Sequence, residues 1–300
     1  MQPPPQSPFG EFIDYLTFQK RYSQHTILAY RNDLSAFFDY IALQYPELDV
    51  PGISPPIIRS WLASLKTGKC SARSINRKLS TLKAFFRYHL KKGAITVNPA
   101  SPVTSLKVSR RLPAFVEQDA MSTLFSHVEF PDTWEGKTDR LLLGIFYQSG
   151  VRLSELINLR ESHVDRGNGT IRIMGKGSKE RIIPLGNALL QEIQAYVRAK
   201  EGFPGDPASP FLLVSEKGKK LYPKRVYQAV KKYLGSVTTS ERKSPHVLRH
   251  TFATHLTNNG ADINAVKELL GHASLASTQV YTHNSISRLR EIYRQAHPKS

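Results

Sequence analysis

The chain has 300 residues, which fits two domains of ordinary size better than one, and 40% of them are hydrophobic, enough to form buried cores. Its 42 Lys and Arg against 24 Asp and Glu leave a net charge of +18, which favours a polyanionic partner such as nucleic acid. The longest apolar stretch, Leu141–Tyr147, is far shorter than the ~20 residues of a membrane-spanning helix, so we expect no membrane insertion.

The N-terminal segment, the single cysteine and the spacing of the histidines also restrict the class of protein. The start of the chain, MQPPPQSPFGEF, has no basic segment followed by an apolar one, so we expect no secretory signal. The single cysteine, Cys70, cannot form an internal disulfide, which suits a reducing cytoplasm. The histidines show no HExxH spacing, and one cysteine cannot build a zinc ribbon. We therefore predict a cytoplasmic, nucleoid-associated protein without a metal or another cofactor.

The first hundred residues predict four helices. Apolar residues recur at helical spacing over Phe9–Lys20, from Thr26 to about Leu43, from Ile57 to Leu65, and over Ser71–Lys92. The fourth helix carries Arg73, Arg77 and Lys83, on a face that either meets solvent or follows a phosphate backbone. The net charge favours the second interpretation, so we predict a helical DNA-binding domain over residues 1–104.

A proline-bracketed segment follows this domain. The stretch SLKVSRRLP, residues 105–113, has little helical periodicity and ends before the next apolar pattern. Its basic residues include Arg110 and Arg111, which we expect to contact DNA phosphates. We interpret the segment as a basic linker between two domains.

The remaining residues, 114–300, show a mixed pattern. Helical periodicity occurs over Asp119–His127, Thr138–Gln148, Ala188–Arg198, Lys224–Leu234, His246–Asn259 and Ile263–Leu270. Two short β-branched runs, Thr170–Met174 and Arg181–Pro184, flank the loop GKGSKE and predict a hairpin. The predicted fold is mainly α with a small antiparallel β-sheet: an N-terminal four-helix domain followed by an α+β domain.

The second domain contains the side chains that phosphodiester cleavage and rejoining need: a nucleophile, a proton donor, and cations for the phosphoryl oxygens. His246 and Arg249 are three positions apart, so both lie on one face of their helix. In chain order the candidates are Arg152 at the mouth of a predicted helix, Lys176 in the hairpin loop, His246, Arg249, His272 and Tyr281. Each residue alone is more typical of a surface charge, a cap or a packed ring. Their combined order is what indicates a phosphoryl-transfer site.

Four segments resemble the signature blocks of a known family. SGVRLSEL, GKGSKERIIPL, HVLRHTFATHL and ELLGHASLASTQVYTH are similar to those of the tyrosine recombinases (phage integrases), particularly the bacterial Xer-type members. The helical first hundred residues resemble the core-binding domain of that family. The resemblance therefore covers nearly the whole chain and implies a tyrosine recombinase catalytic domain in its second part.

The resemblance also implies a role for each candidate residue. Arg152 and Arg249 would hold the non-bridging oxygens of the scissile phosphate, and Tyr281 would attack in line to form a 3′-phosphotyrosyl bond. Lys176 would protonate the leaving 5′ oxygen, with His246 as acid/base partner and His272 as a further hydrogen-bonding member. Lys179, in the same loop as Lys176, is not excluded as the proton donor and is otherwise expected to contact DNA. Exchange of one ester for another stores the bond energy, so no ATP is needed. The arginines and the lysine would supply the positive charge, so no metal is needed either.

The implied partner is a double-stranded DNA recombination site, with a homo- or hetero-tetramer of related recombinases on two such sites. The last segment places Ile286, Leu289, Ile292 and Tyr293 on one face of a possible helix. That face either folds back on its own domain or docks on a neighbouring protomer. The sequence leaves both open.

Two alternatives share this chemistry or scaffold: a type IB topoisomerase-like enzyme and a non-catalytic DNA-binding relative. The compact two-part layout and the complete set of six residues favour a recombinase. The biological role remains open among chromosome-dimer resolution, which serves chromosome partition at cell division, and the integration, excision or inversion of a mobile element.

Overall fold

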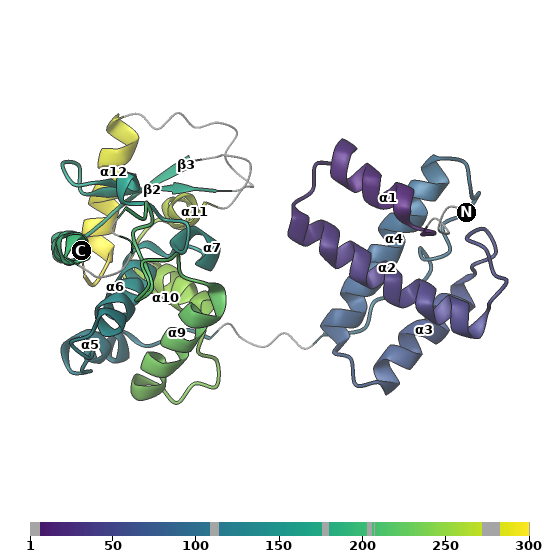
Figure 1. The fold of residues 1–300 in the computed structure, drawn as a ribbon, viewed down its shortest axis with the longest axis horizontal. Helices are drawn as coiled ribbons and strands as arrows, with labels where there is room; N and C mark the ends of the chain where they lie inside the picture. Colours follow the sequence, from purple (N-terminus) through teal and green to yellow (C-terminus); the bar gives the residue numbers. More distant parts are fainter. Residues whose placement is uncertain are drawn as a thin grey trace. The chain divides into compact units, whose positions relative to one another are not determined.

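The computed structural model describes residues 7–108, 114–175, 180–202, 206, 208–271 and 283–299, without the side chains of 283–288. The chain forms two compact units, Met1–Arg111 and Leu112–Ser300 (Figure 1). The boundaries that we predict from the sequence, with a linker over 105–113, stay a prediction, because residues 109–113 lie outside the described part of the chain.

The first unit consists of the four predicted helical segments. The first segment is α1 (Gly10–Asp14), which continues directly into the π-helix η1 (Tyr15–Gln19), and the others are α2 (Gln24–Gln44), α3 (Pro55–Thr67) and α4 (Ala72–Lys91). Ser23 and Ser71 begin α2 and α4 because their hydroxyls accept the backbone N–H of the third residue on. Pro55 begins α3, where a missing N–H has no cost.

Aromatic side chains fill the core of this unit. Phe37 packs edge-on against Trp61 at 4.9 Å between ring centroids, and Phe12 packs edge-on against Phe85 at 5.6 Å. All four rings are almost fully buried. Edge-to-face pairs add to the burial of such rings, so we expect truncation of Trp61 to alanine to cost about 3–5 kcal/mol.

One buried carboxylate joins α2 to α4. Asp33, on α2, accepts hydrogen bonds from Arg77, from Lys78 Nζ at 3.0 Å and from Thr81 Oγ1 at 3.0 Å, all on α4. A buried charge is tolerated only when it is paired and hydrogen-bonded, and this one meets both conditions. Arg77, predicted from sequence to contact DNA, therefore also has a structural partner.

The second unit contains the other helices and the sheet. The helices are α5 (Gln118–Ser126), α6 (Trp134–Ser149), α7 (Leu153–Leu156), η2 (Glu161–His163), α8 (Asn187–Glu201), α9 (Pro223–Val237), α10 (Pro245–Asn258), α11 (Ile263–Leu270) and α12 (His283–Ala296). Helix α6 contains the run LLLGIFYQS, is buried on nearly all sides, and contacts α8, α9 and α10. It is the central helix of the unit, as a helix without a polar face must be.

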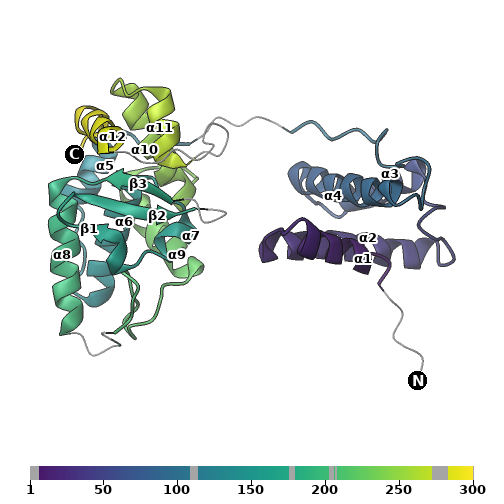
Figure 2. The ribbon, with the colours of Figure 1, turned by 90° about the horizontal axis from the view of Figure 1, so that it is seen from above.

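The sheet is antiparallel with the order β1 (Val164–Asp165), β2 (Thr170–Met174) and β3 (Glu180–Pro184). Its register sets Ile171 opposite Ile183 and Ile173 opposite Arg181. Ile171, Ile173 and Ile183 are buried in the core. Helices α11 and α12 lie against β3 (Figures 1 and 2). The predicted hairpin is confirmed, while β1, the 3-10 helix η2 and the π-helix η1 were not predicted.

The last helix packs on its own unit. Leu289, Tyr293 and Ala296 of α12 are buried in the core of the second unit, and the ring of His297 contacts the backbone carbonyl of Tyr147 at 3.1 Å. The apolar face of this helix therefore folds back on its own domain, which is one of the two arrangements that the sequence left open. Among the described residues, no helix is long and apolar enough to cross a membrane.

Candidate active site

Arg152 is placed by a sharp turn at the end of α6. Gly150 caps this helix with a left-handed φ of 57°, and a Cβ there would lie 2.4 Å from Cδ1 of Phe252, so glycine is required. Two residues later Arg152 occupies the N-cap of α7, with 40% of its side chain exposed. The turn thus sets a cation at the surface of a well-packed core.

Glu155 holds Arg152 in this position. Its carboxylate accepts the backbone N–H of Arg152 at 2.7 Å and Nη1 of Arg152 at 2.8 Å. It also accepts Nη1 and Nη2 of Arg181, at 3.0 and 2.7 Å. Burial alone raises the pKa of Glu155, but the bonds and charge of Arg181, with the bonds of Arg152, outweigh burial and lower the pKa to about 2. Glu155 is therefore an anion at neutral pH.

Arg249 projects from α10 into the same region. Its Nη1 donates to the carbonyl of Gly150 and its Nη2 to the carbonyl of Leu270, both at 2.6 Å. Burial lowers the pKa of Arg249 to about 10, and the charges of Arg152 and Arg181 act in the same direction. At neutral pH the guanidinium is still protonated, so it remains a cation despite its surroundings.

Three arginines meet at the end of α11. The carbonyl of Leu269 accepts Nε of Arg181 at 2.8 Å, that of Leu270 accepts Arg249, and that of Gly271 accepts Nη2 of Arg152 at 3.3 Å. The last carbonyls of a helix have no partner within it and carry partial negative charge, so cations are stabilised there. In the sequence His272 directly follows Gly271.

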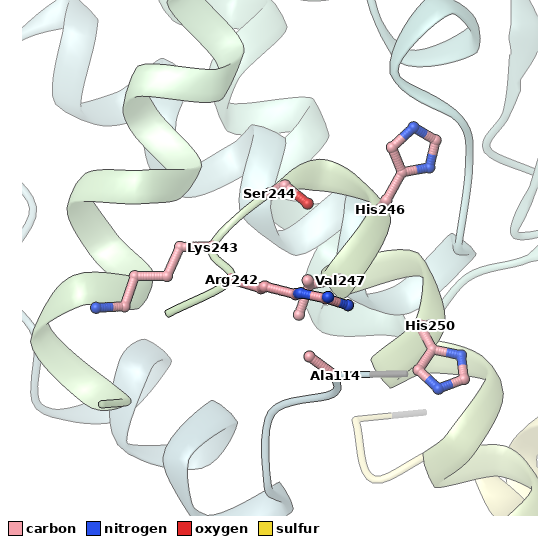
Figure 3. A pocket seen from close by; sticks show the side chains of 7 residues that line it. All are labelled: Ala114, Arg242, Lys243, Ser244, His246, Val247 and His250. Carbon is pink, nitrogen blue, oxygen red and sulfur yellow. The ribbon is translucent and has the colours of Figure 1, made fainter. Parts of the chain in front are cut away.

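His246 lies at the start of α10, three residues before Arg249, and is exposed. It lines a cavity of about 360 Å³, together with Ala114, Arg242, Lys243, Ser244, Val247 and His250 (Figure 3). The figure shows the two histidine rings leaving α10 one turn apart, while Lys243 points away from them. Cationic and imidazole groups at a helix N-terminus form surroundings that suit a phosphate.

The structure describes three of the six predicted site residues, all in the second unit: Arg152 and Arg249 with hydrogen-bonding partners, and His246 at the edge of a cavity. The other three, Lys176, His272 and Tyr281, lie outside the described residues, as do Lys179, Arg110 and Arg111. In the first unit Arg73 and Arg77 are exposed on α4, whereas Lys83 is half-buried. The contact of these residues with DNA stays a prediction.

Sequence reasoning missed two residues of this site, Glu155 and Arg181. The signal for Glu155 is its place three residues after the N-cap Arg152, where a glutamate can accept the N-cap N–H. The signal for Arg181 is its position two residues before Ile183: side chains two apart on a strand point to the same face, which here is the buried one. Among residues with a described position, no three His, Cys, Asp or Glu side chains form a group that could hold a metal.

Both units match family models and proteins that are already known. Residues 114–288 match the phage integrase family, and residues 9–93 match the phage integrase N-terminal SAM-like domain. The chain is 38% identical to tyrosine recombinase XerC of Thermodesulfovibrio yellowstonii over 297 residues, covering 96% of this chain and 95% of that protein. It is 34% identical to tyrosine recombinase XerC of Chlorobaculum tepidum over 316 residues, covering 97% and 94%.

Solved structures agree in fold. The post-cleavage complex of the XerH site-specific recombinase with palindromic difH substrate has a TM-score of 0.71 at 25% identity, over 91% of this chain and 80% of that one. The Tn1549 transposon integrase, in complex with circular intermediate DNA, has a TM-score of 0.72 at 19% identity, over 94% and 98%. The second match supports the fold alone.

Proposed function

This chain belongs to the phage integrase family and is a site-specific tyrosine recombinase, and on that premise we propose that Tyr281 is its nucleophile and that Arg152 and Arg249 hold the scissile phosphate. The observation that carries the proposal is the pairing of the two guanidiniums with adjacent carbonyls, those of Gly271 and Leu270. This pairing keeps two cations side by side at the end of α11, one of them partly exposed, and Gly271 precedes Tyr281 by ten residues in the sequence.

 Two neighbouring cations next to the segment that leads to Tyr281 are what a phosphate clamp requires.

The clamp also explains how a tyrosine can attack at neutral pH. A free phenol titrates near ~10, so only about one in a thousand is ionised at pH 7. Nearby guanidiniums favour the phenolate, since an opposite charge stabilises the charged form. Arginine suits the phosphate because its planar fork donates two hydrogen bonds and keeps its proton.

The proposed reaction exchanges one phosphoester for another. The Tyr281 oxygen bonds to phosphorus as the bond to the 5′ oxygen breaks, and Lys176 supplies the proton that the 5′ oxygen takes up. His246, as the acid/base partner, would take the proton that the phenol of Tyr281 loses, with His272 as a further hydrogen-bonding group. Attack by a 5′ hydroxyl from the exchanged strand reverses these steps, passes through a Holliday junction and restores the tyrosine.

We further propose how the rest of the chain serves this reaction. The helical domain over residues 1–104 would contact DNA through Arg73, Arg77 and Lys83, and the linker over 105–113 through Arg110 and Arg111. Two recombination sites would be held by a homo- or hetero-tetramer of related recombinases at the nucleoid. For the role of this chain, whose relatives are named tyrosine recombinase XerC, we propose chromosome-dimer resolution, with the movement of a mobile element as the alternative.

The first test concerns the nucleophile. Tyr281→Phe removes the attacking oxygen and keeps the ring, so it should retain DNA binding and form no covalent adduct. The measurement uses nicked DNA that carries a site recovered by mapping trapped DNA ends in the source genome. An adduct with Tyr281→Phe would refute the assignment. Efficient relaxation of a supercoiled plasmid without such a site would instead indicate a topoisomerase.

The second test identifies the proton donor. A sulfur in place of the 5′ bridging oxygen leaves as a thiolate without needing a proton. Cleavage by Lys176→Ala should therefore be restored on the sulfur substrate, while Lys179→Ala should be impaired equally on both substrates or not at all. Restoration of Lys179→Ala and not of Lys176→Ala would assign the role to Lys179.

A further inference from the structure

Arg181 occupies a position where an apolar side chain would be expected. It lies on β3 opposite Ile173 and in phase with Ile183, and only 4% of its surface is exposed. Taking a guanidinium out of water is unfavourable unless its N–H groups are paired. The neighbouring isoleucines supply no such partners, so the partners of Arg181 come from elsewhere in the unit.

These partners belong to two other elements. Nη1 and Nη2 of Arg181 bind the two oxygens of Glu155 on α7, and Nε binds the carbonyl of Leu269 on α11. One buried side chain thus joins the strand β3 to both helices. A lysine has a single ammonium and cannot reproduce this fork.

The short helix α7 and the end of α11, which hold these partners, also bind Arg152. Glu155 binds Arg152 with the same carboxylate that Arg181 holds, and the carbonyl of Gly271 accepts Nη2 of Arg152. Gly271 has a left-handed φ of 66°, and a Cβ on it would lie 3.1 Å from Cδ and Nη1 of Arg181. Arg181 is therefore packed beneath the residue whose carbonyl orients Arg152.

The charges of the cluster depend on Arg181 as well. Arg152, Arg181 and Arg249 with Glu155 sum to +2, three cations less one anion. Without Arg181 the sum falls to +1, and Glu155 keeps Arg152 as its only cationic hydrogen-bonding partner among the contacts described above. The carboxylate would then hold Arg152 more strongly and compete with a phosphate for it.

We propose that Arg181 is a positioning residue for the phosphate clamp: it fixes Glu155 and the end of α11, and through them it orients Arg152 and leaves its charge available to the scissile phosphate. This inference rests on the proposed function of Arg152. It also connects the base of the β2–β3 hairpin to the clamp, because Arg181 follows Lys176 by five residues along the same hairpin segment.

The first experiment compares Arg181→Met and Arg181→Lys with the wild-type chain in single-turnover cleavage at saturating protein. We expect Arg181→Met to cleave on the order of 10²-fold more slowly, the scale of a misplaced catalytic group, with DNA affinity unchanged. Arg181→Lys should fall between Arg181→Met and the wild type. A wild-type cleavage rate in folded Arg181→Met would overturn the inference.

Lys200 provides a matched control. It is also a cation buried in the second unit, with 2% of its surface exposed, and it binds Glu161 and the carbonyls of Ser209 and Phe211. Lys200→Met should lower the melting temperature and leave the single-turnover rate below that temperature unchanged. Equal slowing of Lys200→Met and Arg181→Met would mean that Arg181 acts only through folding.

A second substrate separates positioning of the clamp from other defects. A methylphosphonate at the scissile position replaces one non-bridging oxygen by a neutral methyl group, so less charge develops for the arginines to stabilise. The deficit of Arg152→Ala relative to wild type should shrink on this substrate, and that of Arg181→Met should shrink with it. An Arg181→Met deficit of the same size on both substrates would overturn the inference. If Arg181→Met does not fold, Arg181→Lys is judged by the same comparison.

The wild-type chain distinguishes the two levels of the argument. Absence of any covalent adduct with wild-type protein would refute the proposed function itself. A wild-type adduct together with unimpaired cleavage by the Arg181 variants would refute only the role of Arg181.

Discussion

Two polar clusters in the second unit show opposite effects of burial. In the arginine cluster at the end of α11 (Arg152, Glu155, Arg181 and Arg249) each group lies close enough to another charged group to interact with it electrostatically. Glu155 and Arg249 stay charged at neutral pH. In the histidine cluster between α12 and the core (Tyr147, His255, Tyr293 and His297) the groups are held by neutral hydrogen bonds and ring stacking. There burial lowers the pKa of His297 to about 4 and raises the pKa of Tyr147.

The difference indicates what each cluster does. Charges that persist at the surface of a fold can bind a polyanion, and Arg152 of the arginine cluster is partly exposed. Groups that burial keeps neutral instead stabilise the packing around them, and His297 and Tyr293 join α12 to the core. We therefore expect variants of the first cluster to affect cleavage and variants of the second to affect stability.

The largest expected effect is in the arginine cluster. Arg249→Ala or Arg152→Ala should slow cleavage by about 10²–10³-fold, the scale for the loss of one preorganised charge stabiliser. His297→Gln, from the other cluster, should cleave at the wild-type rate below its melting temperature. Single-turnover cleavage of a nicked substrate measures all three variants, and equal slowing by His297→Gln would remove the distinction between the clusters.

A smaller effect should appear in the pH dependence of stability. His297 has a pKa of about 4 in the folded chain against an ordinary value of 6.5, so the unfolded chain binds its proton more readily. Its contribution is present above pH 6.5 and is lost as the pH falls from 6.5 to 4, for a total on the order of 3 kcal/mol. Burial also lowers the pKa of His255, which acts in the same direction.

The measurement is urea unfolding of the full chain at several pH values, with His297→Gln as the comparison. The variant should be less stable at pH 7 and should lose less stability between pH 6.5 and 4 than the wild type. Glu155, whose pKa is about 2 in the folded chain against 4.5, loses its contribution only below pH 4.5. The same slope for both chains between pH 6.5 and 4 would contradict the role given to His297.

Local signals in the sequence predicted most of the fold. The apolar periodicity placed α2, α3 and α4 to within a few residues, and the serine caps and the proline that the structure shows at their starts agree with that placement. The β-branched runs placed β2 and β3. Strand β1 has only two residues and η2 only three, so neither is long enough to show a period.

The site was predicted less completely because its support is tertiary. Arg152, His246 and Arg249 stand out by motif, but the partnership of Arg181 with Glu155 joins residues 26 positions apart, which no local pattern reveals. The meeting of three arginines at the end of α11 likewise depends on how α7, α10 and β3 pack together. Lys176, His272 and Tyr281 remain predictions from sequence.

The most direct test of the account is the identity of the bond between protein and DNA. A suicide substrate should trap the wild-type chain on its DNA, and mass spectrometry of the digested adduct should find the peptide containing Tyr281 joined to a 3′ phosphate. A DNA-linked peptide without Tyr281, or a linkage to a 5′ phosphate, would contradict the account.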